Sequence, residues 1–88
     1  MMHHIVFYTA PLCGDCQKLK AFMDAHGLEY EVRDIKADPA HAQELEANTG
    51  KLGVPYLIIN GEWKRGYVPH EPFSQDFARE LFGLPSPA

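Results

Sequence analysis

Hydrophobic residues occur in short blocks along the chain, separated by polar residues, Gly and Pro. The first block, residues 5–8, is continuously apolar, which is typical of a strand buried on both faces of a parallel sheet. Residues 13–26 then carry large apolar side chains with the spacing of one helical face, and Gly27 follows where a left-handed cap ends a helix. These apolar residues are Leu19, Phe22 and Met23. The pattern predicts a buried strand followed by a helix.

Residues 30–35 alternate between apolar and polar side chains, which predicts an outer strand with one face toward water. Asp38 is suited to cap a helix and Pro39 to occupy its first position, while Gly50 closes the segment about three turns later. Leu45 is the one large apolar residue of this segment. We therefore expect a second, polar helix that lies on the sheet through a small contact.

Residues 56–59 are apolar again, and the Asn60-Gly61 pair that follows is a strong signal for a two-residue hairpin turn. Residues 62–65 are then expected to return as an antiparallel strand. Parallel strands need a crossover helix between them, so the first two strands should flank a helix and the hairpin should add an antiparallel edge.

The C-terminal part of the chain predicts a third helix. Apolar residues recur every four positions between Pro72, suited to a first helical turn, and Gly83, suited to a cap. They are Phe73, Phe77 and Leu81. The tail at residues 85–88 is expected to fray. The complete order is βαβαββα, so the fold class predicted is α/β, with a four-stranded mixed sheet flanked by three helices.

The length of 88 residues fits one domain over residues 1–88, because a chain of this size buries only about 60 to 65% of its unfolded surface. The hydrophobic fraction of 45% suits a small globular core. We expect this domain to act as a monomer.

The formal net charge is -4 and no cluster of Lys and Arg interrupts the sequence, so nucleic acid and anionic membranes are not expected as partners. No apolar run approaches the roughly 20 residues that span a bilayer, and the N-terminus lacks the segments of a signal peptide. We therefore expect a cytoplasmic location.

A CGDC motif at residues 13–16 stands directly after the buried strand and at the start of the first helix. Unpaired backbone N–H groups and the helix dipole stabilise an anion there, so the pKa of the Cys13 thiol should be lowered. Cys16 lies one turn further on, where it can attack a mixed disulfide formed on Cys13. We interpret Cys13 as the nucleophile and Cys16 as the resolving thiol.

The two residues between the cysteines are expected to tune the site. Gly14 leaves space for the backbone of a partner protein to approach. Asp15 places a negative charge near both sulfurs, which disfavours thiolates. We predict a more reducing couple than an uncharged residue at position 15 would give.

Two cysteines at this spacing also have structural interpretations. A disulfide across three residues closes so small a loop that it removes little entropy from the unfolded chain. A zinc site needs four ligands, and His41 and His70 are single histidines without ligand spacing, so no metal is expected. Two inert buried cysteines are the remaining alternative.

Through the CGDC motif, Val54-Pro55 and Gly66-Tyr67, the chain resembles the glutaredoxin and thioredoxin-like superfamily over nearly its whole length. The resemblance implies the thioredoxin-like fold and a redox-active disulfide with no bound cofactor. It also implies that the peptide bond before Pro55 is cis and that Pro55 faces the cysteines. The backbone of Val54 would pair with the peptide of a bound substrate.

The sequence departs from glutaredoxins that bind glutathione. Ala10 stands where a lysine is expected, and residues 66–70 replace a Gly-Gly segment and its carboxylate. Each lost charge-assisted contact should weaken glutathione binding by about 1.5 to 3 kcal/mol. The Gly-aromatic-x-Pro pattern in the same residues resembles the NrdH-type redoxins instead, although His70 replaces their usual acidic residue. Those redoxins take electrons from thioredoxin reductase and reduce ribonucleotide reductase.

Three functions are open at this point. The first is a thiol-disulfide oxidoreductase, an electron carrier of cell redox homeostasis, that reduces protein disulfides by dithiol exchange. Its docking groove would comprise Val54, Pro55, Gly66 and Tyr67, although Tyr67 could also be a sheet-edge aromatic without a ligand. The second is a glutathione-dependent glutaredoxin, which needs Cys13 alone. The third is a carrier that holds an iron–sulfur cluster between two subunits.

Overall fold

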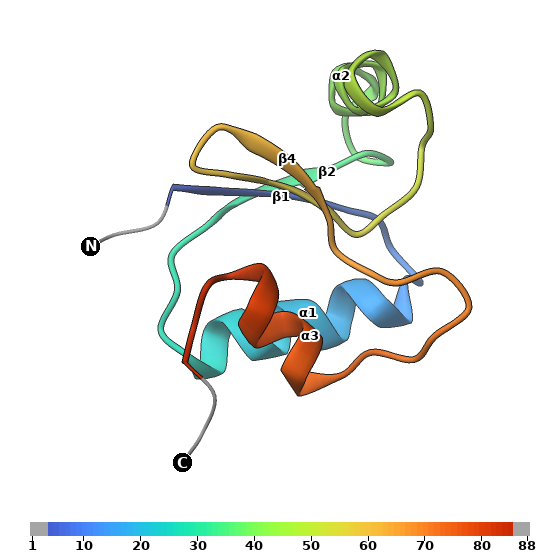
Figure 1. The fold of residues 1–88 in the computed structure, drawn as a ribbon. Coiled ribbons are helices and arrows are strands. Elements are labelled where there is room, and N and C mark those ends of the chain that lie inside the picture. Colours follow the sequence, from blue (N-terminus) through green and yellow to red (C-terminus); the bar gives the residue numbers. More distant parts are fainter. Residues whose placement is uncertain (1–3, 86–88) are drawn as a thin grey trace.

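The computed structural model describes residues 4–85, which form four strands and three helices (Figure 1). In chain order these are β1 (Ile5–Thr9), α1 (Gly14–Ala25), β2 (Glu31–Asp34), α2 (Pro39–Thr49), β3 (Tyr56–Ile59), β4 (Glu62–Arg65) and α3 (Gln75–Leu81). The predicted βαβαββα order is confirmed. Within the described residues, no helix combines the length and the apolar run that a membrane crossing requires.

The four strands form one mixed sheet in the order β2-β1-β3-β4. β1 runs parallel to β2, with Val6 opposite Glu31, and antiparallel to β3, with Ile5 opposite Ile59. The β3–β4 hairpin supplies the antiparallel edge. The outer position of β2 and the mixed α/β class are therefore as the sequence predicts.

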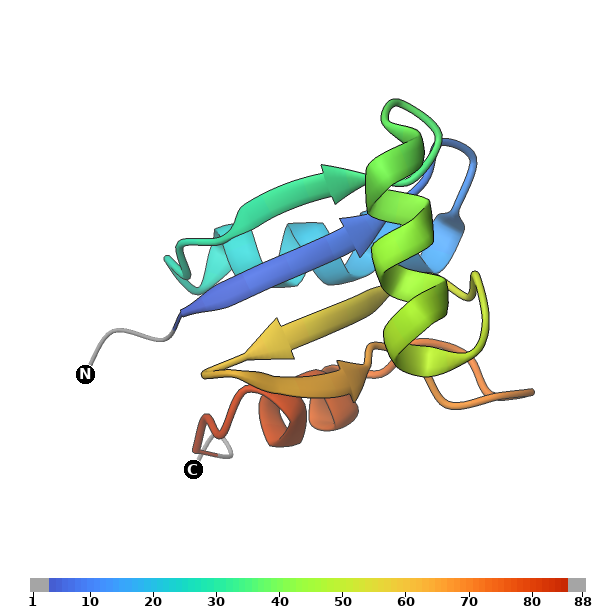
Figure 2. The same ribbon diagram turned by 90° about the horizontal axis from the view of Figure 1, so that it is seen from above.

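Helices cover both faces of this sheet, with α1 and α3 side by side on one face and α2 on the other (Figures 1 and 2). Successive residues of β1 point to opposite faces. Ile5 and Phe7 belong to the core beneath α1 and α3, whereas Val6 and Tyr8 pack with Leu45 of α2. All five side chains are buried, which explains why the β1 sequence is continuously apolar.

A polar network also holds α2 against the sheet. The Tyr8 hydroxyl donates a hydrogen bond to the Glu44 carboxylate and accepts one from Arg33, which pairs with Glu44 as well. The ring of Trp63 stacks on that of Tyr8 with 5.3 Å between centroids. Burial, followed by the hydrogen bond to Glu44, raises the pKa of Tyr8 to about 12, so the hydroxyl stays protonated and can donate.

Local signals place the ends of α2 and the hairpin where they were expected. The Asp38 side chain accepts a hydrogen bond from the backbone N–H of Ala40 at 2.9 Å, and Gly50 ends α2 with φ +79°. Asn60 and Gly61 both have positive φ, +52° and +86°, as a tight hairpin turn between right-twisted strands requires.

The expected start of α3 at Pro72 is wrong. Ser74 is the N-cap, because its side chain accepts a hydrogen bond from the N–H of Phe77 at 3.1 Å, and the helix begins at Gln75. Pro72 and Phe73 lie in the segment before the helix, where Phe73 packs against the core.

The end of α3 agrees with the prediction. Gly83 follows the helix with φ +68°, and its N–H donates a hydrogen bond to the carbonyl of Glu80 at 3.2 Å. The chain then leads to Pro85. The remainder of the predicted frayed tail, residues 86–88, lies outside the described residues.

Candidate thiol redox site

Cys13 is the N-cap of α1, in the turn that leads from β1 into this helix. The backbone N–H of Cys16 donates a hydrogen bond to Cys13 Sγ across 3.2 Å. The two sulfurs form a disulfide, and the two Cα atoms are 5.2 Å apart. The fold thus places both cysteines at the positive end of a helix dipole.

The two cysteines differ in accessibility. Cys16 is 2% exposed and belongs to the core beneath α1 and α3, whereas Cys13 is half-buried at the edge of that core. A partner molecule can therefore reach the sulfur of Cys13 and not that of Cys16. After reduction, a thiolate at Cys13 would receive the Cys16 N–H and the favourable end of the helix dipole.

The Val54–Pro55 segment approaches the cysteine pair from the start of β3. The peptide bond between these residues is cis, as the resemblance implies. The carbonyl oxygen of Val54 lies 3.9 Å from Cys13 Sγ, and Pro55 is buried. The Pro55 carbonyl accepts a hydrogen bond from the N–H of Gly66 at 3.0 Å. A backbone edge therefore lies beside the accessible sulfur.

Gly66 is required by close packing. A Cβ at this position would lie 2.8 Å from Leu57 Cδ1, 2.9 Å from Leu19 Cδ2 and 3.1 Å from the carbonyl oxygen of Pro55. Real Cβ atoms do not approach other heavy atoms so closely in packed interiors. Gly66 is buried, so it supports the segment around the site more than it offers surface to a partner.

Tyr67 is half-buried beside the Val54–Pro55 segment. Its hydroxyl oxygen would be 2.8 Å from a Cβ at Gly53, so a glycine there lets the ring lie close to the backbone. The guanidinium of Arg65 lies 5.4 Å from the ring centroid. Tyr67 is thus held between the loop before β3 and the end of β4.

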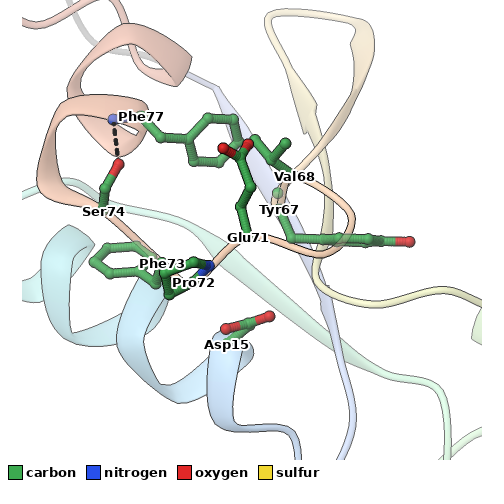
Figure 3. A pocket seen from close by; sticks show the side chains of 9 residues that line it. Asp15, Tyr67, Val68, Glu71, Pro72, Phe73, Ser74 and Phe77 are labelled. Carbon is green, nitrogen blue, oxygen red and sulfur yellow. Dashed lines mark hydrogen bonds between the residues drawn. The ribbon is translucent and has the colours of Figure 1, made fainter.

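The residues between the cysteines face open space. Gly14 is exposed, and a Cβ there would meet no neighbouring group within 4 Å, so another backbone has room to approach. Asp15 is half-buried in the first turn of α1. Its carboxylate lies between α1 and the segment that precedes α3 (Figure 3).

A pocket of about 240 Å³ opens between α1 and residues 66–77. Figure 3 shows Asp15 entering it from α1, while the other side chains come from the segment after β4 and the start of α3. The lining residues are Asp15, Gly66, Tyr67, Val68, Glu71, Pro72, Phe73, Ser74 and Phe77. This pocket, called the Asp15 pocket below, borders the cysteine motif.

The sequence model of the glutaredoxin family matches residues 5–64, from β1 into β4. The chain belongs to the glutaredoxin family. Together with the Cys13–Cys16 disulfide, this membership makes it a thiol redox protein. The expected thioredoxin-like fold is confirmed as well, because solved structures of thioredoxin-like proteins and glutaredoxins superpose on it.

Three known proteins illustrate how closely other proteins resemble this glutaredoxin-family chain. The thioredoxin-like protein BC3987 is 31% identical with a TM-score of 0.67, over 73% of this chain and 88% of that chain. Buckwheat glutaredoxin, solved in complex with glutathione, is 25% identical with a TM-score of 0.60, over 69% and 58% of the two chains. Prostaglandin E synthase 2 from Danio rerio is 35% identical over 57 residues, 65% of this chain and 14% of that protein. The chain spans less than half the length of the curated relatives it matches.

One residue of this glutaredoxin-family protein was not singled out from the sequence. Leu12, next to Cys13, is 99% exposed and has φ +61°, a left-handed conformation that costs a non-glycine residue about 1 kcal/mol or more. An apolar side chain beside the accessible sulfur can contact a docked protein. Its position next to the CGDC motif marks Leu12 as a residue near the site. Neither its exposure nor its backbone conformation follows from the sequence.

A second feature that the sequence did not reveal is a small basic pocket on the other side of Tyr67. Lys51 and Arg65 line it, and its volume is about 40 Å³. The remaining lining residues are Thr49, Gly53, Tyr56 and Tyr67. The two cations are 14 positions apart in the sequence, and the path of β3 and β4 brings them together.

Metal ligands do not gather in the described part of the chain. Between residues 4 and 85, no group of three His, Cys, Asp or Glu side chains is placed to hold a metal ion. His41 instead lies 3.7 Å from the Asp38 carboxylate at the start of α2, and His70 is exposed with φ +67°.

Proposed function

We propose that this glutaredoxin-family protein reduces protein disulfides by dithiol exchange, with Cys13 attacking and Cys16 resolving. The observation that carries the proposal is the asymmetry of the pair. Cys13 is accessible and its sulfur accepts an N–H hydrogen bond at the start of α1, while Cys16 is buried one turn further on. An accessible thiolate beside a protected thiol suits a nucleophile and a resolving residue.

The reaction transfers two electrons in two exchange steps. The Cys13 thiolate attacks one sulfur of the target disulfide, a mixed disulfide forms, and the other target sulfur leaves as a thiolate. The Cys16 thiol then loses its proton and attacks Cys13 Sγ, which breaks the mixed disulfide. The target leaves as a dithiol, and the Cys13–Cys16 disulfide remains to be reduced again.

Docking of the target would use the surface around Cys13. An extended target segment would pair with the backbone of Val54, whose carbonyl lies 3.9 Å from Cys13 Sγ. Gly14 leaves room for that segment above α1, and the exposed side chain of Leu12, next to Cys13 in the chain, offers an apolar contact. Tyr67 would form the far wall, on a backbone position that Gly66 and Pro55 fix.

The reductant we propose is thioredoxin reductase with NADPH, and the target class includes ribonucleotide reductase, as in NrdH-type redoxins. The Gly-aromatic-x-Pro pattern at residues 66–69 supports this assignment. Ala10 in place of a lysine supports it further, because one cation for glutathione is missing.

A second candidate, glutathione-dependent reduction, is favoured by the basic pocket beside Tyr67. Lys51 and Arg65 could hold a carboxylate there, next to the Val54–Pro55 segment. In that case Cys13 alone would suffice for removing glutathione from a mixed disulfide.

Two coupled assays separate the candidates. The oxidised protein is mixed with NADPH and thioredoxin reductase, and separately with NADPH, glutathione and glutathione reductase, and NADPH consumption is followed. We expect turnover with thioredoxin reductase. Turnover with glutathione alone would favour the second candidate, and no turnover in either assay would contradict both.

A matched pair of lysine variants sharpens the second assay. If glutathione is the substrate, Lys51→Gln should raise the KM for a glutathione mixed disulfide several-fold, since one charge-assisted contact is lost. Lys36→Gln is the control, because Lys36 is exposed on the loop before α2 and does not line the basic pocket. An equal KM for both variants would mean that the basic pocket does not support the glutathione-dependent function.

A further inference from the structure

We infer that the Asp15 pocket receives a basic side chain, arginine or lysine, that the target protein carries close to its reacting cysteine. The inference rests on the proposed function, because it names the class of target that the site prefers. It concerns residues outside the cysteine pair and the Val54–Pro55 segment.

The lining of the pocket matches the two parts of such a side chain. Phe73 and Phe77 provide apolar surface, while Asp15 and Glu71 provide carboxylates (Figure 3). Arginine and lysine bury a methylene stem along apolar surface and keep the charged group among polar partners. Aromatic rings also attract cations that lie over their faces.

The two carboxylates are available for an incoming cation. Within residues 4–85, the ion pairs involve other acidic residues, and neither Asp15 nor Glu71 has a basic side chain within pairing distance. Two unpaired carboxylates on one pocket repel an acidic side chain and favour a basic one.

The size of the pocket fits a single side chain. Its volume is about 240 Å³, and it opens to solvent between α1 and the segment before α3. This is room for one long side chain and not for a folded segment of a partner.

The position of the pocket sets where that side chain must be. Asp15 lies between the two cysteines, and Gly66 of the pocket is hydrogen-bonded to Pro55. A target segment paired with Val54 and attacked by Cys13 would therefore carry the basic residue within a few positions of its cysteine. An extended chain covers about 3.3 Å per residue, which keeps this distance short.

Tyr67 divides the surface into regions of opposite charge. It lines the Asp15 pocket on one side and the basic pocket with Lys51 and Arg65 on the other. A basic residue on the target would be attracted to one side and repelled from the other. The charge pattern therefore selects both the side chain and the direction in which the target segment runs.

The test compares two peptides that differ in one charge. Each carries a cysteine joined by a disulfide to thionitrobenzoate, and a nearby residue is either arginine or citrulline, its neutral isostere. The reduced protein releases coloured thionitrobenzoate as Cys13 and then Cys16 exchange. We expect a second-order rate constant for thionitrobenzoate release about two- to fivefold higher for the arginine peptide at low salt, the range of an exposed charge pair. The ratio of the arginine rate to the citrulline rate should approach one at high salt.

Glu71→Gln should reduce this preference, measured as the ratio of the arginine rate to the citrulline rate in the same variant. Glu80→Gln is the matched control, because Glu80 is exposed on α3 and does not line the Asp15 pocket. Equal rates for the two peptides at low salt, or a preference in Glu71→Gln as large as in the wild type, would overturn the inference and leave the proposed function intact.

A binding readout keeps the inference separate from turnover. Peptides with serine in place of cysteine are added to the oxidised protein, and the backbone NMR signals of Phe73 and Phe77 are followed. Larger shifts with the arginine peptide support the inference even if neither disulfide peptide is reduced, an outcome that would contradict the proposed function alone. Equal shifts with both peptides contradict the inference.

Discussion

The backbone N–H of Cys16 donates a hydrogen bond to Cys13 Sγ across 3.2 Å, so the proposed resolving residue also supports the proposed nucleophile. In the reduced protein the same N–H would point at the Cys13 thiolate. The start of α1 adds the positive end of its dipole. Both effects act on Cys13 and leave the buried thiol of Cys16 without such support.

The first prediction concerns the alkylation of the reduced protein. The rate of reaction with iodoacetamide should rise with pH around a midpoint below that of a cysteine in an unstructured peptide, because N–H donors and the helix dipole are expected to stabilise the Cys13 thiolate. Mass spectrometry after brief labelling should find the label on Cys13 and not on Cys16, which is 2% exposed. Equal labelling of both cysteines, or an ordinary midpoint, would contradict this account.

The second prediction concerns the charge of Asp15. Its carboxylate disfavours thiolates at both sulfurs, so removing it stabilises the reduced form. Asp15→Asn should raise the reduction potential by about 10 to 20 mV, the equivalent of roughly 0.5 to 1 kcal/mol for a partly exposed charge. Titration against glutathione redox buffers measures the potential of each protein.

Asp76→Asn is a suitable control for this measurement. Asp76 lies in the first turn of α3, is 91% exposed and pairs with Arg79, away from the cysteines. Its substitution should leave the potential unchanged. An unchanged or lowered potential in Asp15→Asn would show that this carboxylate does not set the couple.

The third prediction concerns the packing around Gly66. A methyl group there would lie within 3 Å of Leu57 and Leu19 and near the carbonyl of Pro55, so the surrounding core must shift. Gly66→Ala should lower the free energy of unfolding by about 1 to 3 kcal/mol in urea denaturation. Gly14→Ala should not lower it, because a Cβ at Gly14 meets no neighbouring group within 4 Å. Equal stability of the two variants would contradict the close packing at Gly66.

The fourth prediction concerns the pH dependence of stability. The hydrogen bond from Tyr8, and then the charge of Arg33, lower the pKa of Glu44. A carboxyl group whose pKa falls on folding stabilises the protein above its unfolded pKa, and this contribution is lost as pH falls through the folded value. Glu44→Gln should therefore lower the free energy of unfolding at pH 7 by about 0.5 to 1.5 kcal/mol, as expected for a hydrogen bond with a partly exposed charge.

The difference between Glu44→Gln and the wild type should narrow below about pH 4, where the carboxyl group becomes protonated. Glu46→Gln on the same helix is the control, because the side chain of Glu46 is exposed and makes no contact in this network. Thermal unfolding across roughly pH 3 to 7, the range around the carboxyl pKa, measures the difference in stability between the two proteins. A difference that stays constant over this range would refute the role of the Glu44 charge.

Local sequence signals predicted most of the fold because each is satisfied within a few residues. Asp38 caps α2 through the N–H of Ala40, and Asn60-Gly61 turns the hairpin with its own backbone angles. The buried run of β1 and the motif that follows it placed the cysteines at the start of α1. These elements need no distant partner to be recognised in the sequence.

The predicted start of α3 was wrong because two helix-start signals, Pro72 and Ser74, lie within three residues of each other. Pro72 suits a first turn, but Ser74 satisfies the N–H of Phe77 with its side chain. Phe73 and Ala78, which flank that cap, both belong to the core, in the arrangement of a hydrophobic staple. Tertiary packing thus decided between Pro72 and Ser74.

The pockets around the cysteines depend on contacts between residues far apart in the sequence. Asp15 and Glu71 share a pocket although 56 positions separate them, and Lys51 meets Arg65 only through the path of the sheet. Neither hydrophobic periodicity nor a short motif predicts that such distant residues come together. The sequence therefore predicted the cysteine pair, whereas the arrangement of the charges that surround it emerges from the fold.

The most direct test of dithiol exchange is a trapping experiment with Cys16→Ser. The reduced variant is mixed with a disulfide-containing protein in the assay that gives turnover with the wild type, and the products are analysed by mass spectrometry. The account predicts that a mixed disulfide accumulates on Cys13 and that turnover of the protein disulfide is lost, while Cys13→Ser forms no adduct. Full turnover by Cys16→Ser without an adduct on Cys13 would contradict the account.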